Sequence, residues 1–270
     1  MFYLHDIRHC KHSVIQQSFP DGTLHLSLPD IAMSAVTWHY ENDAELFTLM
    51  CIVDYYDHIP TLYMPYLPHA RMDRVKANTD VFTLKTFAKA INALGFDDVR
   101  MLDVHSNVGM ALIDHAEPMP ITLASFHEWA ISEVRERCDG EEPLLFFPDE
   151  GAMKRYADDI GMRYAFGMKR RDWNTGAILG LDIINKELVR GRDVLIIDDI
   201  CSRGGTFLHS AKALKEAGAK SVFLAVTHAE DTMVSGEMYT TPGLVDHIFT
   251  TDSLFTLEEG NEDKISIYDL

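Results

Sequence analysis

Short apolar runs alternate along this chain with longer segments in which apolar residues recur every three or four positions. The short runs predict buried strands, and the periodic segments predict helices with one apolar face. Strands are expected at 61–67, 99–104, 144–147, 163–168, 177–183, 194–199, 222–227 and 246–250, and helices at 43–56, 80–94, 125–138, 150–160 and 207–217. Residues 1–26 predict a hairpin, or a loop and a strand, around a turn at 19–23. The alternation predicts right-handed crossovers and largely parallel sheets.

The stretch Val194–Thr206 carries the most informative chemistry. Four apolar residues precede Asp198 and Asp199, and a short loop then reaches Gly204, Gly205 and a threonine before a helical pattern begins. Glycines let a ligand approach the backbone, and free amides at a helix N-terminus favour a phosphate. Carboxylates suit sugar hydroxyls or, through water, Mg²⁺. The pattern favours a sugar-phosphate site, and the alternative is an ordinary strand-to-helix turn with a solvated acid pair.

Polar residues also follow other predicted strands. Arg71, His105 and Asp149 each come close behind a strand, as Asp198 does. Ligands of open α/β sheets bind at the carboxyl ends of the strands, so we expect these residues to converge. Taken singly, each has an ordinary explanation. The arginine suits a surface ion pair, the histidine a structural hydrogen bond, and Asp149 either a metal or the cap of the following helix.

The charge of the chain narrows the choice of partners. A formal net charge of −18 argues against nucleic acid, whose phosphate backbone needs a basic surface. Two basic clusters stand out against this background, Arg71 with Arg74 and the run Lys169–Arg171. The second lies in a predicted polar loop, and three adjacent cations suit a clamp on a phosphoryl group in transfer. A solvated turn is the alternative interpretation.

Length and composition set broader limits. The 270 residues, 47% of them hydrophobic, suffice for one large or two small domains, and a break near 118–120 predicts two α/β halves. No apolar run is long enough to cross a bilayer, and the N-terminus lacks the pattern of a secretory signal. The four cysteines are scattered without metal-like spacing. We therefore expect a cytoplasmic protein with reduced thiols and no membrane partner.

The loop at 198–206 resembles the phosphoribosyl-diphosphate signature of the type I phosphoribosyltransferase fold. Further segments, in matching order over most of the chain, resemble those of the ribose-phosphate pyrophosphokinase family. They are Phe19-Pro-Asp-Gly22, Tyr66-Leu-Pro-His-Ala-Arg-Met-Asp-Arg74, Leu102-Asp-Val-His105, Phe147-Pro-Asp-Glu-Gly151 and Lys169-Arg-Arg171. The arginine and histidine segments distinguish this family from the transferases that act on bases.

The resemblance implies an α/β fold of two phosphoribosyltransferase-like halves, each a mainly parallel sheet flanked by helices. Residues 1–120 would form an ATP-binding half and residues 121–270 a half with the ribose-phosphate loop. The implied activity moves the β,γ-diphosphoryl group of Mg-ATP to the anomeric hydroxyl of ribose 5-phosphate, which gives phosphoribosyl diphosphate and AMP. A homodimer or homohexamer is expected, in which the Phe19 segment is often contributed across a subunit interface.

The resemblance also assigns roles to residues. Those expected to act in catalysis are Lys169, Arg171 and His105, and those expected to hold Mg²⁺ are His105 and Asp149. ATP would be bound by Phe19, Asp21, Arg71, Met72, Arg74 and His105. The acceptor would be bound by Asp198, Asp199, Cys201, Ser202, Arg203, Gly204, Gly205 and Thr206.

The chain departs from the family at several of these positions. Ser202 and Arg203 replace the Asp-Thr of the usual loop, and Thr23 and Met72 replace a Glu and a Gln near the base. Because Arg203 adds a cation beside the 5-phosphate, an alternative acceptor is ADP-ribose, whose terminal ribose has a free anomeric hydroxyl next to a pyrophosphate. The product would then be ADP-ribose pyrophosphate, for rebuilding NAD. A non-catalytic, nucleotide-binding family member is a third reading.

Overall fold

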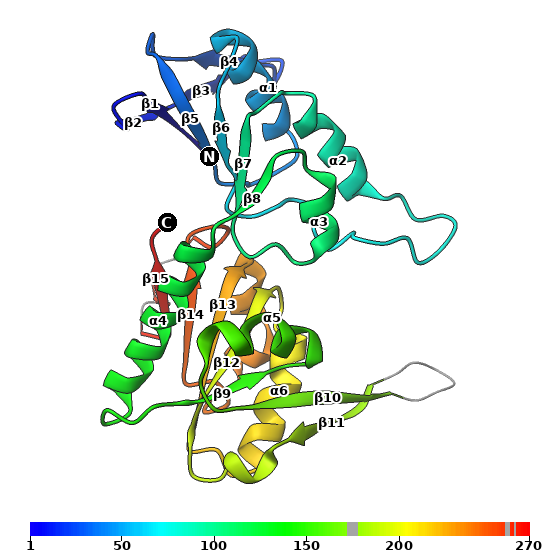
Figure 1. The fold of residues 1–270 in the computed structure, drawn as a ribbon, viewed down its shortest axis with the longest axis vertical. Coiled ribbons are helices and arrows are strands. Elements are labelled where there is room, and N and C mark those ends of the chain that lie inside the picture. Colours follow the sequence, from blue (N-terminus) through cyan, green and yellow to red (C-terminus); the bar gives the residue numbers. More distant parts are fainter. Residues whose placement is uncertain (172–177, 257–259, 262) are drawn as a thin grey trace. The chain divides into compact units, whose positions relative to one another are not determined.

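The computed structural model describes residues 1–171, 178–256, 260–261 and 263–270, without the side chains of 169–171 and 178–179. The chain divides into two compact units, Met1–Pro120 (unit 1) and Ile121–Leu270 (unit 2) (Figure 1). Among the described residues, every helix is too short or too polar to cross a bilayer.

Unit 1 is built on a six-stranded sheet in the order β2-β1-β5-β6-β7-β8. Strands β5 to β8 pair in parallel, and β1 is antiparallel to both of its neighbours. The strands are β1 (Phe2–Asp6), β2 (Lys11–Ser13), β5 (Met33–Trp38), β6 (Thr61–Tyr63), β7 (Asp98–Met101) and β8 (Ala116–Pro118). The helices are α1 (Glu45–Tyr56), α2 (Thr83–Asn92) and α3 (Asn107–Leu112). A separate hairpin pairs β3 (Ile15–Ser18) with β4 (Leu24–Ser27).

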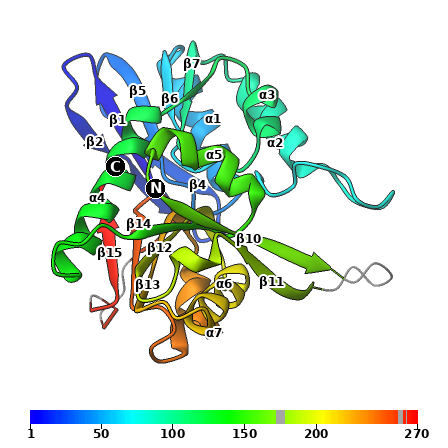
Figure 2. The same ribbon diagram turned by 60° about the horizontal axis from the view of Figure 1, so that its bottom comes forward.

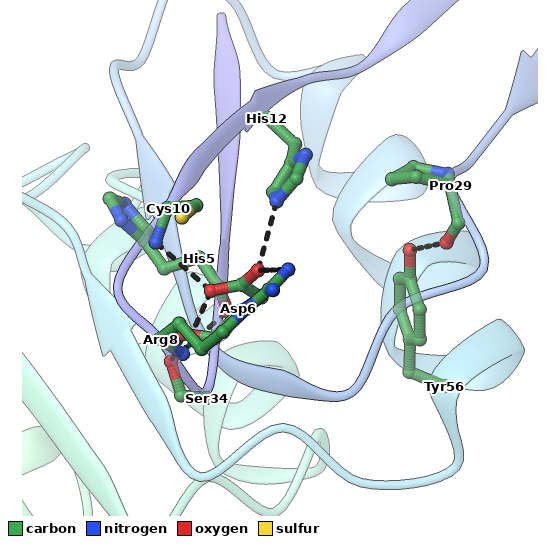
Figure 3. A network of polar contacts seen from close by, with 8 residues as sticks. All are labelled: His5, Asp6, Arg8, Cys10, His12, Pro29, Ser34 and Tyr56. Carbon is green, nitrogen blue, oxygen red and sulfur yellow. Dashed lines mark hydrogen bonds and ion pairs between the residues drawn. The ribbon is translucent and has the colours of Figure 1, made fainter.

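The turn between β1 and β2 is organised around one buried carboxylate (Figure 3). Asp6 is 3% exposed and accepts hydrogen bonds from the backbone amides of Cys10 (3.0 Å) and Arg8 (2.8 Å). The Arg8 guanidinium and the His12 imidazole lie 3.2 and 3.4 Å from its second oxygen. These contacts, led by the Cys10 amide, hold the pKa of Asp6 well below its usual range. The turn therefore owes its shape to a fully satisfied, ionised side chain.

Unit 2 contains a seven-stranded sheet in the order β11-β10-β9-β12-β13-β14-β15. Among its described strands, only the β10–β11 pairing is antiparallel. The strands are β9 (Leu144–Phe147), β10 (Tyr164–Arg171), β11 (Ile178–Ile184), β12 (Asp193–Cys201), β13 (Ser221–Ala229), β14 (His247–Thr251) and β15 (Ile265–Tyr268). The helices are α4 (Pro120–Arg137), α5 (Glu150–Ile160), α6 (Gly205–Glu216) and α7 (Glu237–Thr240), with 3₁₀ turns at Lys186–Leu188 and Asp231–Ser235.

Strand β12 is buried on both faces, as expected for a central parallel strand. Val194 and Ile196 pack in the core that contains α6, whereas Leu195 and Ile197 pack in the core that contains α4 and α5. Figure 2 shows α5 and α6 on opposite sides of this sheet. Because side chains alternate along a strand, Asp198 is expected on the α6 face and Asp199 on the α5 face.

The α/β alternation and the mainly parallel sheets confirm the predicted fold class. The elements at 144–147 and 150–160 lie where the periodicity placed them. Lys169–Arg171, predicted to lie in a loop, instead continue β10, because their backbones pair with the antiparallel strand β11. The sequence pattern also missed α3, β8 and β15, each of only three to six residues.

Candidate functional site

The predicted acidic residues of unit 2 lie at the carboxyl ends of two neighbouring strands. Strands β9 and β12 pair in parallel, so their carboxyl ends meet at the same edge of the sheet. Asp149 follows β9 after one proline, and Asp198 and Asp199 lie near the end of β12. Three carboxylates therefore gather at this edge.

Asp149 is the N-cap of α5, one of the two roles the sequence left open. Its Oδ1 accepts hydrogen bonds from the backbone amides of Gly151 (3.0 Å) and Ala152 (3.1 Å). These bonds satisfy two of the amides that the first turn of a helix leaves without an internal partner. The cap fixes the direction of the carboxylate, which is also what a metal ligand requires.

Strand alternation assigns Asp198 and Asp199 to opposite faces of β12, but at the end of the strand the two carboxylates still lie close enough to interact. Asp198 follows the α6 face and is half-buried, whereas Asp199 follows the α5 face and is 5% exposed. The Asp199 carboxylate lies 3.5 Å from the guanidinium of Arg155 on α5. The backbone amide of Asp199 donates a hydrogen bond to Oδ1 of Asp198 (3.0 Å). The two acidic residues are thus not equivalent, although the sequence offers them as a pair.

Burial raises the pKa of Asp198 well above its usual value, and the charges of Asp199 and Asp149 raise it further. A cation at this edge would relieve that cost. Carboxylate oxygens are the hard ligands that Mg²⁺ prefers, usually one or two of them together with water and substrate phosphates. The described residues contain no group of three or more His, Cys, Asp or Glu side chains that could hold a metal ion by themselves. The carboxylates at this edge are nonetheless donors of the type that fits Mg²⁺.

The loop after β12 combines buried anchors with exposed backbone. Cys201 is fully buried in the α6 core, and its carbonyl oxygen accepts a hydrogen bond from the Glu230 amide (2.8 Å). The hydroxyls of Ser202 and Thr232 lie 3.3 Å apart. Gly204 caps α6 in the left-handed conformation, with φ of 73°, and Gly205 opens the helix with space around its Cα. The predicted loop residues thus form one continuous turn, to which Cys201 contributes through its carbonyl oxygen and through its thiol, which donates to the Ser202 carbonyl oxygen (3.4 Å).

Segment 230–238 packs closely against this loop. A Cβ added at Gly236 would overlap the Arg203 carbonyl oxygen and stand 2.9 Å from the carbonyl carbon. A Cβ added at Gly204 would stand 2.8 Å from the methyl group of Met238, which is fully buried. The loop backbone therefore packs closely against Gly236 and Met238, so a larger residue at Gly236 would meet the backbone of Arg203.

Arg203 stands out within the loop because its side chain is exposed. Its own backbone is held against Gly236, so the position of its Cα is fixed while the side chain extends into solvent. Among the ion pairs formed by the described residues, none involves the Arg203 guanidinium. A cation beside a predicted phosphate loop, in a chain of net charge −18, is free to meet an anion.

The basic cluster Lys169–Arg171 is placed only in part. Its backbone lies in β10, where Lys169 pairs with Leu181 and Arg170 with Gly180. The side chains of Lys169 and Arg171 lie outside the described part of the structure. Their catalytic role stays a prediction.

In unit 1, the loops that follow β6 and β7 pack against each other. The Met64 amide donates to the Arg100 carbonyl (2.9 Å), and the Leu102 amide donates to the Pro65 carbonyl (3.0 Å). A Cβ added at Gly109 would come within 2.7 Å of side chains from both loops. The segments with the predicted ATP ligands therefore share one edge of the sheet of unit 1.

The predicted ligands on these loops are mostly accessible. Arg71 is exposed, Met72 and His105 are half-buried, and Asp103 adopts a positive φ of 43° just before the histidine. Arg74 has a 75% exposed side chain and lies 3.9 Å from Asp73, the weak end of ion-pair geometry. Such long, solvated cations can reorient toward a bound polyphosphate.

The last predicted ATP residues lie at the tip of the β3–β4 hairpin. The Phe19 amide donates to the Thr23 carbonyl (2.9 Å), and Asp21 accepts from the Thr23 hydroxyl (2.7 Å) and amide (3.0 Å). These bonds lower the pKa of Asp21, and Phe19 stays 51% exposed. The turn is formed in advance and presents an aromatic ring to solvent.

Sequence reasoning missed two residues of the site in unit 2. Arg155 could have been found as a cation in the second turn of a helix that Asp149 caps, within a strongly acidic chain. Gly236 left no usable signal, because its role depends on the close approach of a segment 33 residues away in the sequence.

Comparison with known proteins adds independent findings. Residues 152–237 match the family model described as phosphoribosyl transferase domain. The ribose-phosphate pyrophosphokinase of Sulfurisphaera tokodaii is 28% identical over 78% of this chain and 74% of its own length. That of Pyrococcus abyssi is 26% identical over 94% and 87%, and that of Campylobacter jejuni 30% over 72% and 61%.

The crystal structure of phosphoribosylpyrophosphate synthetase from Mycobacterium smegmatis has a similar fold. It superposes with a TM-score of 0.72 and covers 95% of this chain and 86% of its own, at 18% sequence identity. Fold similarity thus extends well beyond the stretch that the family model matches.

Proposed function

Because this chain belongs to the ribose-phosphate pyrophosphokinase family, we propose that it transfers the β,γ-diphosphoryl group of Mg-ATP to an anomeric ribose hydroxyl. Ribose 5-phosphate is the first candidate acceptor, which gives phosphoribosyl diphosphate and AMP. One observation carries the proposal. At the carboxyl edge of the sheet in unit 2, Asp198 and Asp199 are followed directly by a glycine-containing turn that packs against segment 230–238 and begins α6.

The acceptor would lie along this edge. The amides of the loop and the first turn of α6 would bind the 5-phosphate, because they are exposed donors at the positive end of a helix dipole. Asp198 and Asp199 would accept hydrogen bonds from the ribose hydroxyls. These contacts orient the anomeric hydroxyl, and alignment together with charge neutralisation provides most of the rate enhancement in phosphoryl transfer.

For the nucleotide, the proposed base and polyphosphate contacts come from unit 1. Arg71 and Arg74 would contact the polyphosphate, and Phe19 would stack on the adenine. His105 of unit 1 and Asp149 of unit 2 are each proposed as a ligand of Mg²⁺, which would supply neutralisation of charge on the transferring group. Lys169 and Arg171 would donate hydrogen bonds to the same group as its negative charge moves toward the leaving phosphate.

ADP-ribose is the second candidate acceptor, and Arg203 is the observation that favours it. An acceptor that continues beyond the 5-phosphate carries a second phosphate close to the loop. The Arg203 guanidinium, which is exposed and extends from a backbone held against Gly236, would form charge-assisted hydrogen bonds with such a phosphate. The product would be ADP-ribose pyrophosphate.

The direct test supplies Mg-ATP with either acceptor alone and follows AMP release and product mass. The first candidate predicts turnover with ribose 5-phosphate, and the second predicts preferential turnover with ADP-ribose. Arg203→Thr restores the residue that the family usually has and should reduce use of ADP-ribose while use of ribose 5-phosphate persists. Absence of AMP release with both acceptors would contradict the proposal.

A second test addresses the non-catalytic alternative. Lys169→Ala should lower kcat by about 10³-fold and leave most of the affinity for ATP, because the lysine would act on the transferring group rather than on the base. Lys154→Ala, which removes an exposed cation paired with Glu150, is the matched control. A chain that only binds nucleotide would not distinguish the two variants.

We extend the proposal to assembly and location. The chain would work in the cytoplasm as a homodimer or homohexamer, with the Phe19 hairpin completing the nucleotide site of a second copy. The exposure of Phe19 at the tip of a preformed turn supports this. Sedimentation of the protein with and without Phe19→Ala tests it, since a monomer in both cases would contradict it.

A further inference from the structure

The carboxylate of Asp199 needs a counter-charge because water hardly reaches it. The residue is 5% exposed, and its position on the α5 face places it at the end of a fully apolar row that includes Leu195 and Ile197. An ionised carboxylate in such surroundings costs several kcal/mol unless it is paired and hydrogen-bonded. Arg155 supplies the charge, with its guanidinium 3.5 Å from the Asp199 Oδ2.

The arginine itself rests on a rigid surface. Its guanidinium lies 5.7 Å from the ring centroid of Tyr156, a residue that is 2% exposed. The Tyr156 ring stacks on Phe147 of β9 (6.3 Å) and meets the His127 ring of α4 edge-on (5.3 Å). The cation is therefore placed by packed aromatic rings on elements that flank the predicted site.

We propose that Arg155 is a positioning residue for the acceptor, which holds Asp199 in the orientation that accepts the ribose hydroxyls. This inference rests on the proposed function. The guanidinium contacts Oδ2 of the carboxylate, so the ion pair restrains rotation of the Asp199 side chain. The acceptor then meets a carboxylate that does not have to be reoriented when it binds.

The location of the ion pair separates this role from simple stabilisation. A buried ion pair contributes little net stability compared with apolar residues of the same size, because desolvation offsets the attraction. The next cation on the same helix, Lys154, forms an ordinary surface pair with Glu150 at 2.7 Å, with both side chains at least 66% exposed. Lys154 is therefore the matched control, because its recorded ion pair is with Glu150 rather than with an acid of β12.

The experiment compares Arg155→Ala, Arg155→Lys and Lys154→Ala with the wild-type chain. Binding of ribose 5-phosphate and of ADP-ribose is measured by calorimetry in the presence of Mg²⁺ and α,β-methylene-ATP, which cannot transfer its terminal phosphates. Arg155→Ala should weaken binding of the preferred acceptor at least tenfold, as expected for the loss of a charged contact. Arg155→Lys should fall between, and Lys154→Ala should match the wild type.

Steady-state kinetics add a readout that a purely structural role would not change. The KM for the acceptor should rise in Arg155→Ala by the same factor, while the KM for ATP stays within about twofold, because the nucleotide does not depend on this carboxylate. In an Asp199→Asn background the Arg155 substitution should have almost no further effect on acceptor binding.

Two results would overturn the inference. Either acceptor binding is unchanged in both Arg155 variants, or the effects of Arg155→Ala and Asp199→Asn add in full. If Arg155→Ala does not fold, Arg155→Lys decides, since it keeps the charge and loses the planar fork. Failure of the wild-type chain to bind either acceptor would instead overturn the proposed function together with this inference.

Discussion

In unit 2 the predicted acceptor ligands Asp198 and Asp199 lie at the end of a buried strand. In unit 1 the predicted ATP-binding arginines lie on exposed loops. Asp199 is 5% exposed and ion-paired across to α5, but the Arg74 side chain is 75% exposed and barely within reach of Asp73. Each unit has its predicted ligands at the carboxyl edge of its own sheet. In unit 2 these side chains are held in place by packing, whereas in unit 1 they are solvated and can change orientation.

The difference follows from what each unit is proposed to bind. A sugar phosphate is small, and discrimination between acceptors needs fixed donors and acceptors, which only packed neighbours can hold in place. A triphosphate is long and highly charged, so solvated arginines can find it without prior alignment. We therefore expect the acceptor-binding side chains to be rigid and the nucleotide-binding side chains to adapt to their ligand. Substitutions in each unit can test this difference.

The largest effect is expected where the rigidity of unit 2 is removed directly. Gly236→Ala places a methyl group against the Arg203 carbonyl and forces the loop to shift. A displacement of about 1 Å in a positioned group can cost about 10²-fold in rate, so kcat/KM for the acceptor should fall by that order. The measurement is steady-state turnover with the acceptor varied at saturating ATP.

Ser235→Ala is the control for Gly236→Ala, since it changes the adjacent residue by a small volume and removes only a hydrogen bond to the Thr232 carbonyl. It should leave acceptor kinetics near those of the wild type. Unchanged acceptor kinetics in a folded Gly236→Ala variant would show that the loop adapts, and the contrast between the units would fail.

A smaller effect is expected from unit 1. Arg71→Ala should raise the KM for ATP roughly tenfold, the worth of one charge-assisted hydrogen bond, without altering the KM for the acceptor. Because the side chain is exposed, the difference between wild type and variant should shrink as salt rises from 0.05 to about 0.5 M.

Lys85→Ala, an exposed cation on α2 of the same unit, is the control for Arg71→Ala. A substitution at Arg71 that changes acceptor KM as strongly as ATP KM would remove the distinction between a nucleotide unit and an acceptor unit.

Much of this arrangement could be predicted from the sequence, and the limits have physical causes. The apolar run before Asp198 predicted a buried strand, and the glycines predicted the turn that follows, because both signals are local. The different roles of Asp198 and Asp199 were not predicted, although strand alternation alone implies opposite faces. Two adjacent aspartates have the same chemistry, so the sequence by itself does not distinguish their roles.

Long-range contacts could not be predicted. The sequence predicts a loop at Lys169–Arg171, but the structure has these residues in β10. Their backbones pair with β11, and no local pattern in the sequence indicates that pairing. The support of the loop by Gly236 depends likewise on segments far apart in the chain. Neither feature alters local periodicity, which is the only quantity that a single sequence displays clearly.

The smallest effect concerns how the two units respond to acid. Burial and then the charge of Arg137 lower the pKa of His247 in unit 2 to about 4, and its ring is 2.8 Å from the Ser266 hydroxyl. The unfolded chain binds this proton near pH 6.5, so stability is full above that pH and is lost as pH falls toward 4. In unit 1, by contrast, the lowered pKa of Asp6 preserves its contribution to far lower pH.

Between pH 7 and 5.5 His247 should cost unit 2 about 1 kcal/mol. Thermal melts over this range, read from the ring of Trp129 on α4 in a background with Trp38→Phe and Trp173→Phe, should show Tm falling with pH. His247→Asn should flatten that dependence, whereas His209→Asn, at an exposed site on α6, should not. If unit 1 lost stability first as the pH fell, or the slope survived in His247→Asn, the packed side of unit 2 would not be the acid-sensitive one. The contrast drawn from burial would then hold for ligand binding but not for folding.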